Sequence, residues 1–241
     1  MRALLPRLDS RTTLTDRVYE ALRALILNGT LAPGQRITES EVAAQMGISI
    51  TPVREAFLKL EAAGLLVIRP RQAAQVSMLS LAELEQYAMI RIALETALLD
   101  IVIERIGEEE LHTIKSTLAI MRQLQQDGNW EAYARAHRQF HELLIEPAGC
   151  PIVKRMVMDV FDTAQRYYRV CQTAAPEFWA WDQSGHEELV GAIERKDRSA
   201  VHRALRQLHS EFARSVRNAV QRGEERLARY FVEFVPAACG K

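Results

Sequence analysis

Helical periodicity fills the chain from residue 80 to residue 222, and this feature limits the fold more than any other. No stretch in that range alternates apolar and polar residues as a half-buried strand does. Turn-forming residues interrupt the pattern and divide it into segments. The predicted helices cover about 80–106, 108–126, 130–147, 151–172, 178–196 and 199–222. We therefore expect an all-α antiparallel bundle of about six helices.

Two shorter helices are predicted at the start of the chain. Apolar residues recur at helical spacing over residues 14–28, and Gly29 stops this helix. Thr38 and Glu41 have the spacing of a capping box, in which each side chain bonds the backbone N–H of the other residue. This box predicts a short second helix that ends at Gly47.

A third helix and a strand pair follow. Thr51 is the expected N-cap and Pro52 the first helical residue, and Gly64 ends the helix. The β-branched run at 65–68 and the later Val76 predict a two-stranded ribbon. The order helix, helix, turn, helix and ribbon is that of a winged helix-turn-helix domain.

The predicted fold is therefore mainly α and has two domains. Its parts are an N-terminal arm at 1–14, the winged helix-turn-helix at 15–76, the helical domain at 80–222 and a C-terminal tail at 223–241. Arg and Lys number ten against seven Asp and Glu in residues 1–76, and 21 against 24 after them. A basic module joined to an acidic one suits a protein that contacts phosphate at one end only.

The third helix is short enough to enter a DNA major groove, where its N-terminal residues would meet base edges. The wing would reach phosphates or the minor groove. An alternative for Arg54 is a surface ion pair with Glu55 or Glu61, and Lys59 is equally explained as an ordinary exposed lysine. The predicted DNA-binding residues are Ser49, Thr51, Arg54, Lys59, Arg71 and Gln72.

The sequence also suggests the compartment. Three cysteines, Cys150, Cys171 and Cys239, are far apart and form no CxxC pair, so neither a disulfide framework nor a thiolate metal site is expected. No apolar run approaches the roughly 18 residues that a membrane helix needs, and the first residues have too short an apolar stretch for a secretory signal. We expect a cytoplasmic protein with no membrane partner.

Four histidines lie on or beside the apolar stripes of three predicted helices. His137 and His141 are spaced i, i+4 on one helix, and His186 and His209 lie on two others. Buried imidazoles need polar partners, and one divalent metal would satisfy all four. The alternative is that each is a hydrogen-bonded core histidine.

One stretch of the first domain resembles a known family. The run PGQRITESEVAAQMGISITPVREAFLKLEAAGLL is similar to the winged helix of the GntR family of bacterial transcription regulators, in its FadR-like subgroup. Ile50 stands where the family usually has arginine, and Ala73 where it usually has the glycine of the wing tip. Ile50 cannot donate a hydrogen bond but can contact a thymine methyl, so the resemblance implies an operator different from the family norm.

The helical domain resembles the FCD effector domain of the same subgroup. The similarity lies in HRQFHELLIEPAGC, GHEELVGAIERKD and ALRQLHSEF. It implies metal ligands at His137, His141, His186 and His209. His137 stands where the family has aspartate or asparagine, and Cys150 where asparagine is common.

Four imidazoles would suit Zn²⁺, with Ni²⁺ as a second choice, and they leave the charge of a dication uncompensated. We therefore expect a small carboxylate as effector; the alternative is that His137 marks a lost metal site. The resemblance places Arg91 in the effector cavity, facing that carboxylate, although Arg91 and Glu95 can also form a plain i, i+4 ion pair. Tyr87 and Arg166 are further predicted effector-binding residues.

The function favoured is a ligand-responsive transcription regulator, acting as a repressor and binding a pseudo-palindromic DNA operator as a homodimer. A regulator that senses the metal itself would use the same residues. A metallohydrolase with Glu142 or Glu187 as general base is the alternative from another class. It is disfavoured because HExxH and GxSxG motifs are absent from the sequence, so no enzymatic activity is expected.

Overall fold

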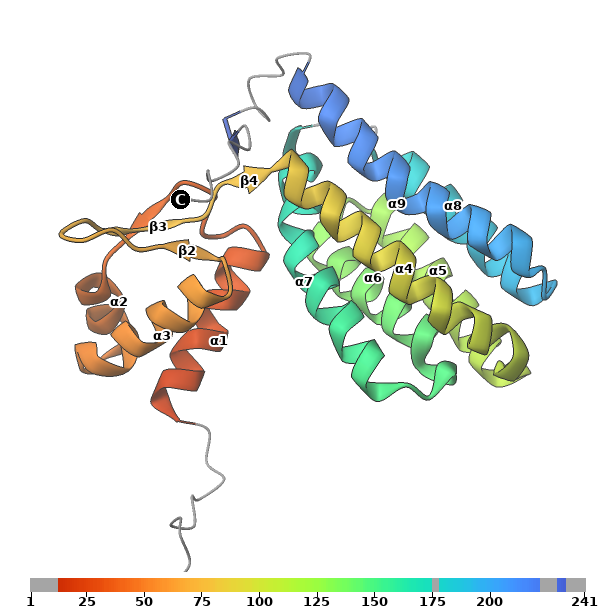
Figure 1. Cartoon of the computed structure of the whole chain (residues 1–241), viewed down its shortest axis with the longest axis horizontal. Coiled ribbons are helices and arrows are strands. Elements are labelled where there is room, and N and C mark those ends of the chain that lie inside the picture. The colour runs from red at the N-terminus through yellow and green to blue at the C-terminus, as the bar shows by residue number, and fades with distance from the viewer. Residues whose placement is uncertain (1–12, 175–177, 222–228, 233–241) are drawn as a thin grey trace, which may run out of the picture. The chain divides into compact units, whose positions relative to one another are not determined.

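The computed structural model describes residues 13–174, 178–221 and 229–232. The chain divides into two compact units, Met1–Met78 and Leu79–Lys241 (Figure 1). The architecture is mainly α, as predicted, with a winged helix-turn-helix followed by a helical bundle. The predicted arm up to residue 12, the helix break at Ala175–Pro176 and most of the predicted C-terminal tail lie outside the described residues.

Three helices and a three-stranded antiparallel sheet form the described part of the first unit. The helices are α1 (Leu14–Leu27), α2 (Glu39–Met46) and α3 (Ile50–Ala62), and the strands are β1 (Arg36–Ile37), β2 (Leu66–Val67) and β3 (Ala74–Val76). The strand order is β1-β3-β2, with Leu66 opposite Val76 and Ile37 opposite Ala74.

The sheet has one strand more than the predicted ribbon. β1 is only two residues long, so it carries no periodicity that sequence analysis can detect. The chain reaches it through a turn at Gly34, whose φ of +83° is in the left-handed region. A Cβ on Gly34 would also lie 3.0 Å from the sulfur of Met78, so both the backbone and the packing favour glycine there.

The predicted capping box of α2 is confirmed. The Thr38 hydroxyl accepts a hydrogen bond from the Glu41 N–H at 3.2 Å, and Glu41 Oε2 accepts one from the Thr38 N–H at 3.0 Å. The predicted start of α3 at Thr51 is wrong, because the helix begins at Ile50 after an extended Ser49. Pro52 fits inside this first turn, where backbone N–H groups have no partner within the helix.

Six α-helices, one 3-10 turn and a two-stranded parallel sheet make up the described part of the second unit. They are β4 (Leu79–Ser80), α4 (Leu81–Arg105), α5 (Glu108–Gln126), α6 (Trp130–Ile145), η1 (Glu146–Ala148), α7 (Pro151–Ala174), α8 (Phe178–Glu194), α9 (Arg198–Gln221) and β5 (Phe231–Val232). Among the described residues, no helix is both long enough and apolar enough to span a membrane.

The bundle places α4 against both α7 and α9, while α5 packs on α6 and α8 on α9 (Figure 1). Its apolar core draws on every one of these helices. At Gly185 of α8 a Cβ would lie 2.8 Å from Leu208 Cδ1 of α9, so the missing side chain leaves room for this leucine. The next residue, His186, is fully buried in the core.

The pairing of β4 with β5 was not predicted. Leu79 lies opposite Phe231, and the Leu79 N–H donates to the Tyr230 carbonyl at 2.9 Å. Tyr167 fixes β4 from the other side: its hydroxyl accepts from the Ser80 N–H at 3.2 Å and donates to the Ser80 carbonyl at 3.1 Å. A two-residue parallel pairing between Leu79–Ser80 and Phe231–Val232, which are far apart in the chain, leaves no local signal in the sequence.

Two leucines of α3 provide a matched test of the first core. Leu60 is fully buried among apolar residues of α1 and the sheet, whereas Leu58 is 55% exposed on the same helix. We predict that Leu60→Ala lowers the free energy of unfolding by about 2–5 kcal/mol through lost burial and a cavity. Leu58→Ala should change it by no more than about 0.5 kcal/mol. Urea unfolding of the two variants checks this, and equal losses would contradict the packing described for α3.

Candidate functional site

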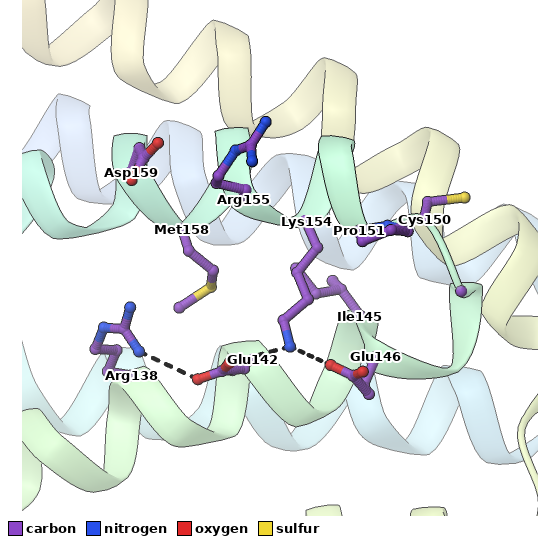
Figure 2. Close-up of a pocket in the computed structure, with 11 residues that line it drawn as sticks. Arg138, Glu142, Ile145, Glu146, Cys150, Pro151, Lys154, Arg155, Met158 and Asp159 are labelled. Carbon is purple, nitrogen blue, oxygen red and sulfur yellow. Dashed lines mark hydrogen bonds and ion pairs between the residues drawn. The ribbon is translucent and has the colours of Figure 1, made fainter. Parts of the chain in front are cut away.

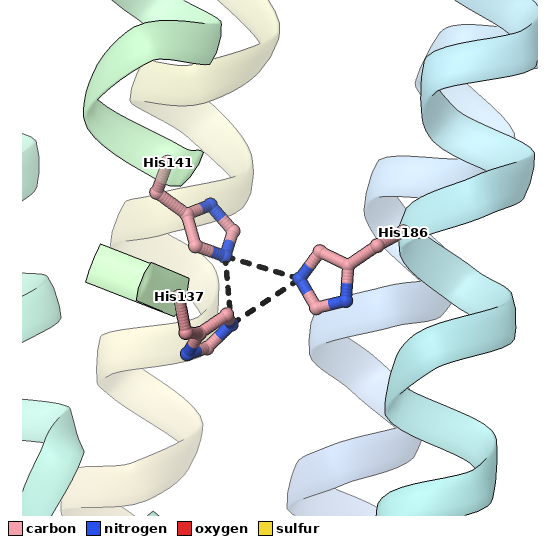
Figure 3. A group of neighbouring side chains, drawn as sticks. All are labelled: His137, His141 and His186. Atoms are coloured by element: carbon pink, nitrogen blue, oxygen red, sulfur yellow. Dashed lines mark hydrogen bonds between the residues drawn. The ribbon is translucent and has the colours of Figure 1, made fainter. Parts of the chain in front are cut away.

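Three histidine side chains converge in the core of the second unit. His137 and His141 lie one turn apart on the buried face of α6, and His186 faces them from α8 (Figure 3). Their Nε2 atoms form a triangle with sides of 3.1, 3.2 and 3.2 Å. All three side chains are at most 2% exposed.

This triangle is a poor hydrogen-bonding arrangement but a good set of metal ligands. A neutral imidazole Nε2 carries either one hydrogen or one lone pair, so three such atoms cannot satisfy one another in pairs. A tetrahedral zinc with Zn–N bonds of about 2.0–2.1 Å separates its ligands by about 3.3 Å. The observed sides are close to that value, so the donor set fits one face of a tetrahedral metal site and leaves a fourth position open.

Aromatic side chains surround the three imidazoles. Tyr133 stacks on His137 with centroids 5.7 Å apart, Phe161 lies 5.0 Å from the centre of His141, and Phe140 lies 5.1 Å from that of His186. Burial, assisted by the charge of Arg91, lowers the pKa of His141 well below its usual value. Its ring is therefore neutral, as a metal ligand must be.

A second polar network adjoins the triangle. Arg91 and Glu95 on α4 form a buried ion pair with Nε and Oε1 2.6 Å apart, and the other oxygen of Glu95 lies 3.2 Å from His209 Nε2. Burial alone would raise the pKa of Glu95, but the charges of Arg91 and His209 outweigh it and lower the pKa to about 2. Glu95 is thus an anion in the core.

The structure brings together three of the four predicted ligands. The Nε2 atoms of His137, His141 and His186 all lie within 4.8 Å of one another and form a candidate metal site. His209 is equally buried, but its Nε2 faces Glu95. Its role as a fourth ligand stays a prediction.

Arg91 makes the i, i+4 pair that the sequence also allowed, and it makes a further contact. Its Nη2 lies 3.2 Å from His141 Nδ1, and its guanidinium lies 4.8 Å from the centre of the Phe161 ring. The pairing of Glu95 with His209 was not predicted from the sequence. A signal existed, because Arg91 and Glu95 occupy helical positions in line with Leu84 and Leu98, where a buried stripe is otherwise apolar.

Tyr87 and Arg166 gather near the start of α4. The Tyr87 ring meets Tyr167 edge-on, with centroids 6.0 Å apart. Burial lowers the pKa of Arg166, with opposing contributions from Tyr167 and Tyr87. Both residues therefore lie close to the tyrosine that fixes β4. Their role in effector binding stays a prediction.

The two glutamates of the hydrolase alternative lie on the surface. Glu142 bonds Arg138 at 3.1 Å and Lys154 at 3.0 Å, across a groove of about 560 Å³ between α6 and the start of α7 (Figure 2). Glu187 pairs with Arg122. Both carboxylates are thus engaged in ion pairs at the surface of the bundle.

The predicted DNA-binding residues divide into two places. A groove of about 550 Å³ in the first unit is lined by Ile50 and Arg54 of α3 and by Arg71 and Gln72 of the wing. Ser49 and Thr51 lie at the start of the same helix. Lys59 lies apart from them and pairs with Asp16 of α1 at 2.6 Å.

Arg54 forms a surface pair, but with a different partner from those expected. Its Nε lies 3.0 Å from Glu39 Oε2, and its side chain is 65% exposed. Glu55 instead accepts from the Thr15 hydroxyl, and Glu61 from the Ile68 N–H. Since an exposed ion pair contributes little free energy, Arg54 can leave Glu39 for a nucleic acid.

The two units of the chain match two known protein families. The family described as "Bacterial regulatory proteins, gntR family" matches residues 14–76, and the FCD domain matches residues 86–211. The HTH-type transcriptional repressor RspR of Escherichia coli K12 is 28% identical over 221 residues, which are 91% of this chain and 96% of that protein. A probable D-xylose utilization operon transcriptional repressor of Paenarthrobacter nicotinovorans is 32% identical over 143 residues, 58% of this chain and 61% of that protein.

Solved structures show the same fold. E. coli McbR/YncC superposes with a TM-score of 0.72 at 24% identity, covering 88% of this chain and 99% of that one. A GntR regulator from Rhodococcus sp. RHA1 gives 0.73 at 21% identity, covering 86% and 99%. The relatives are regulators and not enzymes. The chain belongs to the GntR family of bacterial regulatory proteins, in the group that carries an FCD domain, and is a DNA-binding transcription regulator.

Proposed function

We propose that this regulator is a cytoplasmic repressor whose operator affinity is set by a small carboxylate bound at a divalent metal in the helical domain. The observation that carries the proposal is the convergence of three buried Nε2 atoms on one point. Zn²⁺ suits three imidazoles best, and Ni²⁺ is the second choice. The metal would supply one open coordination position for the effector.

The charge of the site favours an anionic effector. His137, His141 and His186 are neutral as ligands, so they leave the charge of a bound dication to be balanced by other groups. Glu95 is the nearby anion that the structure describes, and it is already paired with Arg91. A carboxylate at the open position would supply the missing charge and could bond Arg91, whose planar fork suits carboxylates.

The DNA-binding proposal rests on α3 and the wing. Thr51 and Arg54 would read base edges, with Ser49 at the helix start, while Arg71 and Gln72 would contact the backbone or the minor groove. Lys59 would reach a phosphate only by leaving Asp16. A homodimer would present two such units to the half-sites of a pseudo-palindromic operator. The proposal of repression is supported by the names of two relatives.

The role of Arg54 can be measured once an operator has been selected from random duplexes. We predict that Arg54→Ala weakens specific binding by about 1–3 kcal/mol and relaxes the preference at one base pair, because a bidentate base contact is lost. Arg135→Ala, which removes an equally exposed arginine from α6, is the control and should leave affinity unchanged. Fluorescence anisotropy checks both variants, and unchanged binding by Arg54→Ala would reduce Arg54 to a surface ion-pair residue.

The metal content tests the histidine site. We predict about one zinc per chain in protein loaded with Zn²⁺ and passed through gel filtration, and loss of that ion in His141→Ala because two imidazoles hold a dication poorly. His112→Ala, which removes an exposed histidine from α5, should keep it. Elemental analysis measures all three proteins. Absence of zinc from the wild type would make His137 the mark of a lost site, whereas equal zinc in His141→Ala would place the ion elsewhere.

A further inference from the structure

We propose that Arg91 locks His141 in the tautomer that cannot bind a metal, so that metal binding and the release of Arg91 from His141 are one event. This inference rests on the proposed metal site and states how its occupancy is controlled. It follows from the direction of one hydrogen bond, from Arg91 Nη2 to His141 Nδ1, whose atoms are 3.2 Å apart in the core.

The direction of that hydrogen bond is determined by chemistry. A guanidinium has only donors, so Nδ1 of His141 must be the acceptor and carry the lone pair. The neutral imidazole has a single N–H, which must then be on Nε2. Arg91 thus fixes the tautomer of His141 from the side of the ring that faces away from the other histidines.

The Nε2 of His141 is the atom that a metal needs. It lies 3.1 Å from the Nε2 of His137 and 3.2 Å from that of His186. With a hydrogen on this atom, His141 donates to one of its neighbours and offers no lone pair to an ion. Metal binding through all three Nε2 atoms therefore requires the hydrogen of His141 to move to Nδ1 of the same ring, with no proton gained or lost.

The move creates a conflict at Arg91. Nδ1–H would face Nη2–H of the guanidinium, and two donors 3.2 Å apart cannot bond. Arg91 must turn this nitrogen away, while its Nε can stay on Glu95 at 2.6 Å. The freed Nη2 would then be a buried donor in need of a new acceptor, and the carboxylate of an effector bound at the metal would be such an acceptor. Metal and carboxylate would each favour binding of the other, because both require Arg91 to leave His141.

A variant that removes the donor without changing the charge isolates this effect. Arg91→Met with Glu95→Gln deletes both members of the ion pair, so the net charge beside the site is unchanged and no buried charge is left alone. We expect this double variant to bind Zn²⁺ alone about tenfold to a hundredfold more tightly than the wild type, the range for one charge-assisted hydrogen bond. Glu95→Gln by itself keeps the Arg91 donor and should show no gain. Competition with a chromophoric chelator gives the affinities.

The tautomer itself supplies a second readout, which does not require any variant to fold. In the metal-free wild type, ¹⁵N NMR of the His141 ring should show a bare Nδ1 and a protonated Nε2, and zinc should reverse the two. A protonated Nδ1 in the metal-free wild type would overturn the inference. So would a double variant that binds zinc no better than the wild type, although the metal site would then stand. If neither protein binds zinc, the metal site and this inference fail together.

Discussion

The candidate site of the second unit depends on three imidazoles that α6 and α8 bring together in the core. The buried stripe of α6 presents two histidines on successive turns, and α8 supplies the third. Together they put three nitrogen atoms within 3.2 Å of one another in a buried aromatic surrounding. Burying polar atoms without adequate partners costs free energy. A bound ion is the simplest partner that serves all three at once.

The network on α4 and α9 also consists of buried polar groups that need partners. Glu95 is an anion in the core, with Arg91 on one side and His209 on the other. Arg91 also reaches His141, so the candidate metal site and the only paired core carboxylate of the described residues share one guanidinium. This sharing gives the domain a physical means of linking an ion, an anionic effector and a helix that begins beside β4.

Sequence reasoning recovers what is encoded locally and misses what depends on distant contacts. The capping box of α2 and the six helices of the bundle depend on residues close together in the sequence, so they were predictable. The two-residue strands β1 and β5 pair with segments far along the chain and leave no periodicity. Thr51 was predicted as the N-cap of α3 because threonine is a common N-cap residue. Ser49, two residues earlier, has the extended conformation of an N-cap instead. The contact of His209 with Glu95 could not be predicted, because it depends on the packing of α4 against α9.

Both proposals require that His137, His141 and His186 bind one metal ion and leave a coordination position open. Anomalous diffraction at the zinc edge, from crystals of zinc-loaded protein, would locate such an ion. We expect a single strong peak about 2.0–2.1 Å from all three Nε2 atoms, displaced from their plane toward the open position. Zinc peaks confined to surface carboxylates, with none between α6 and α8, would contradict it.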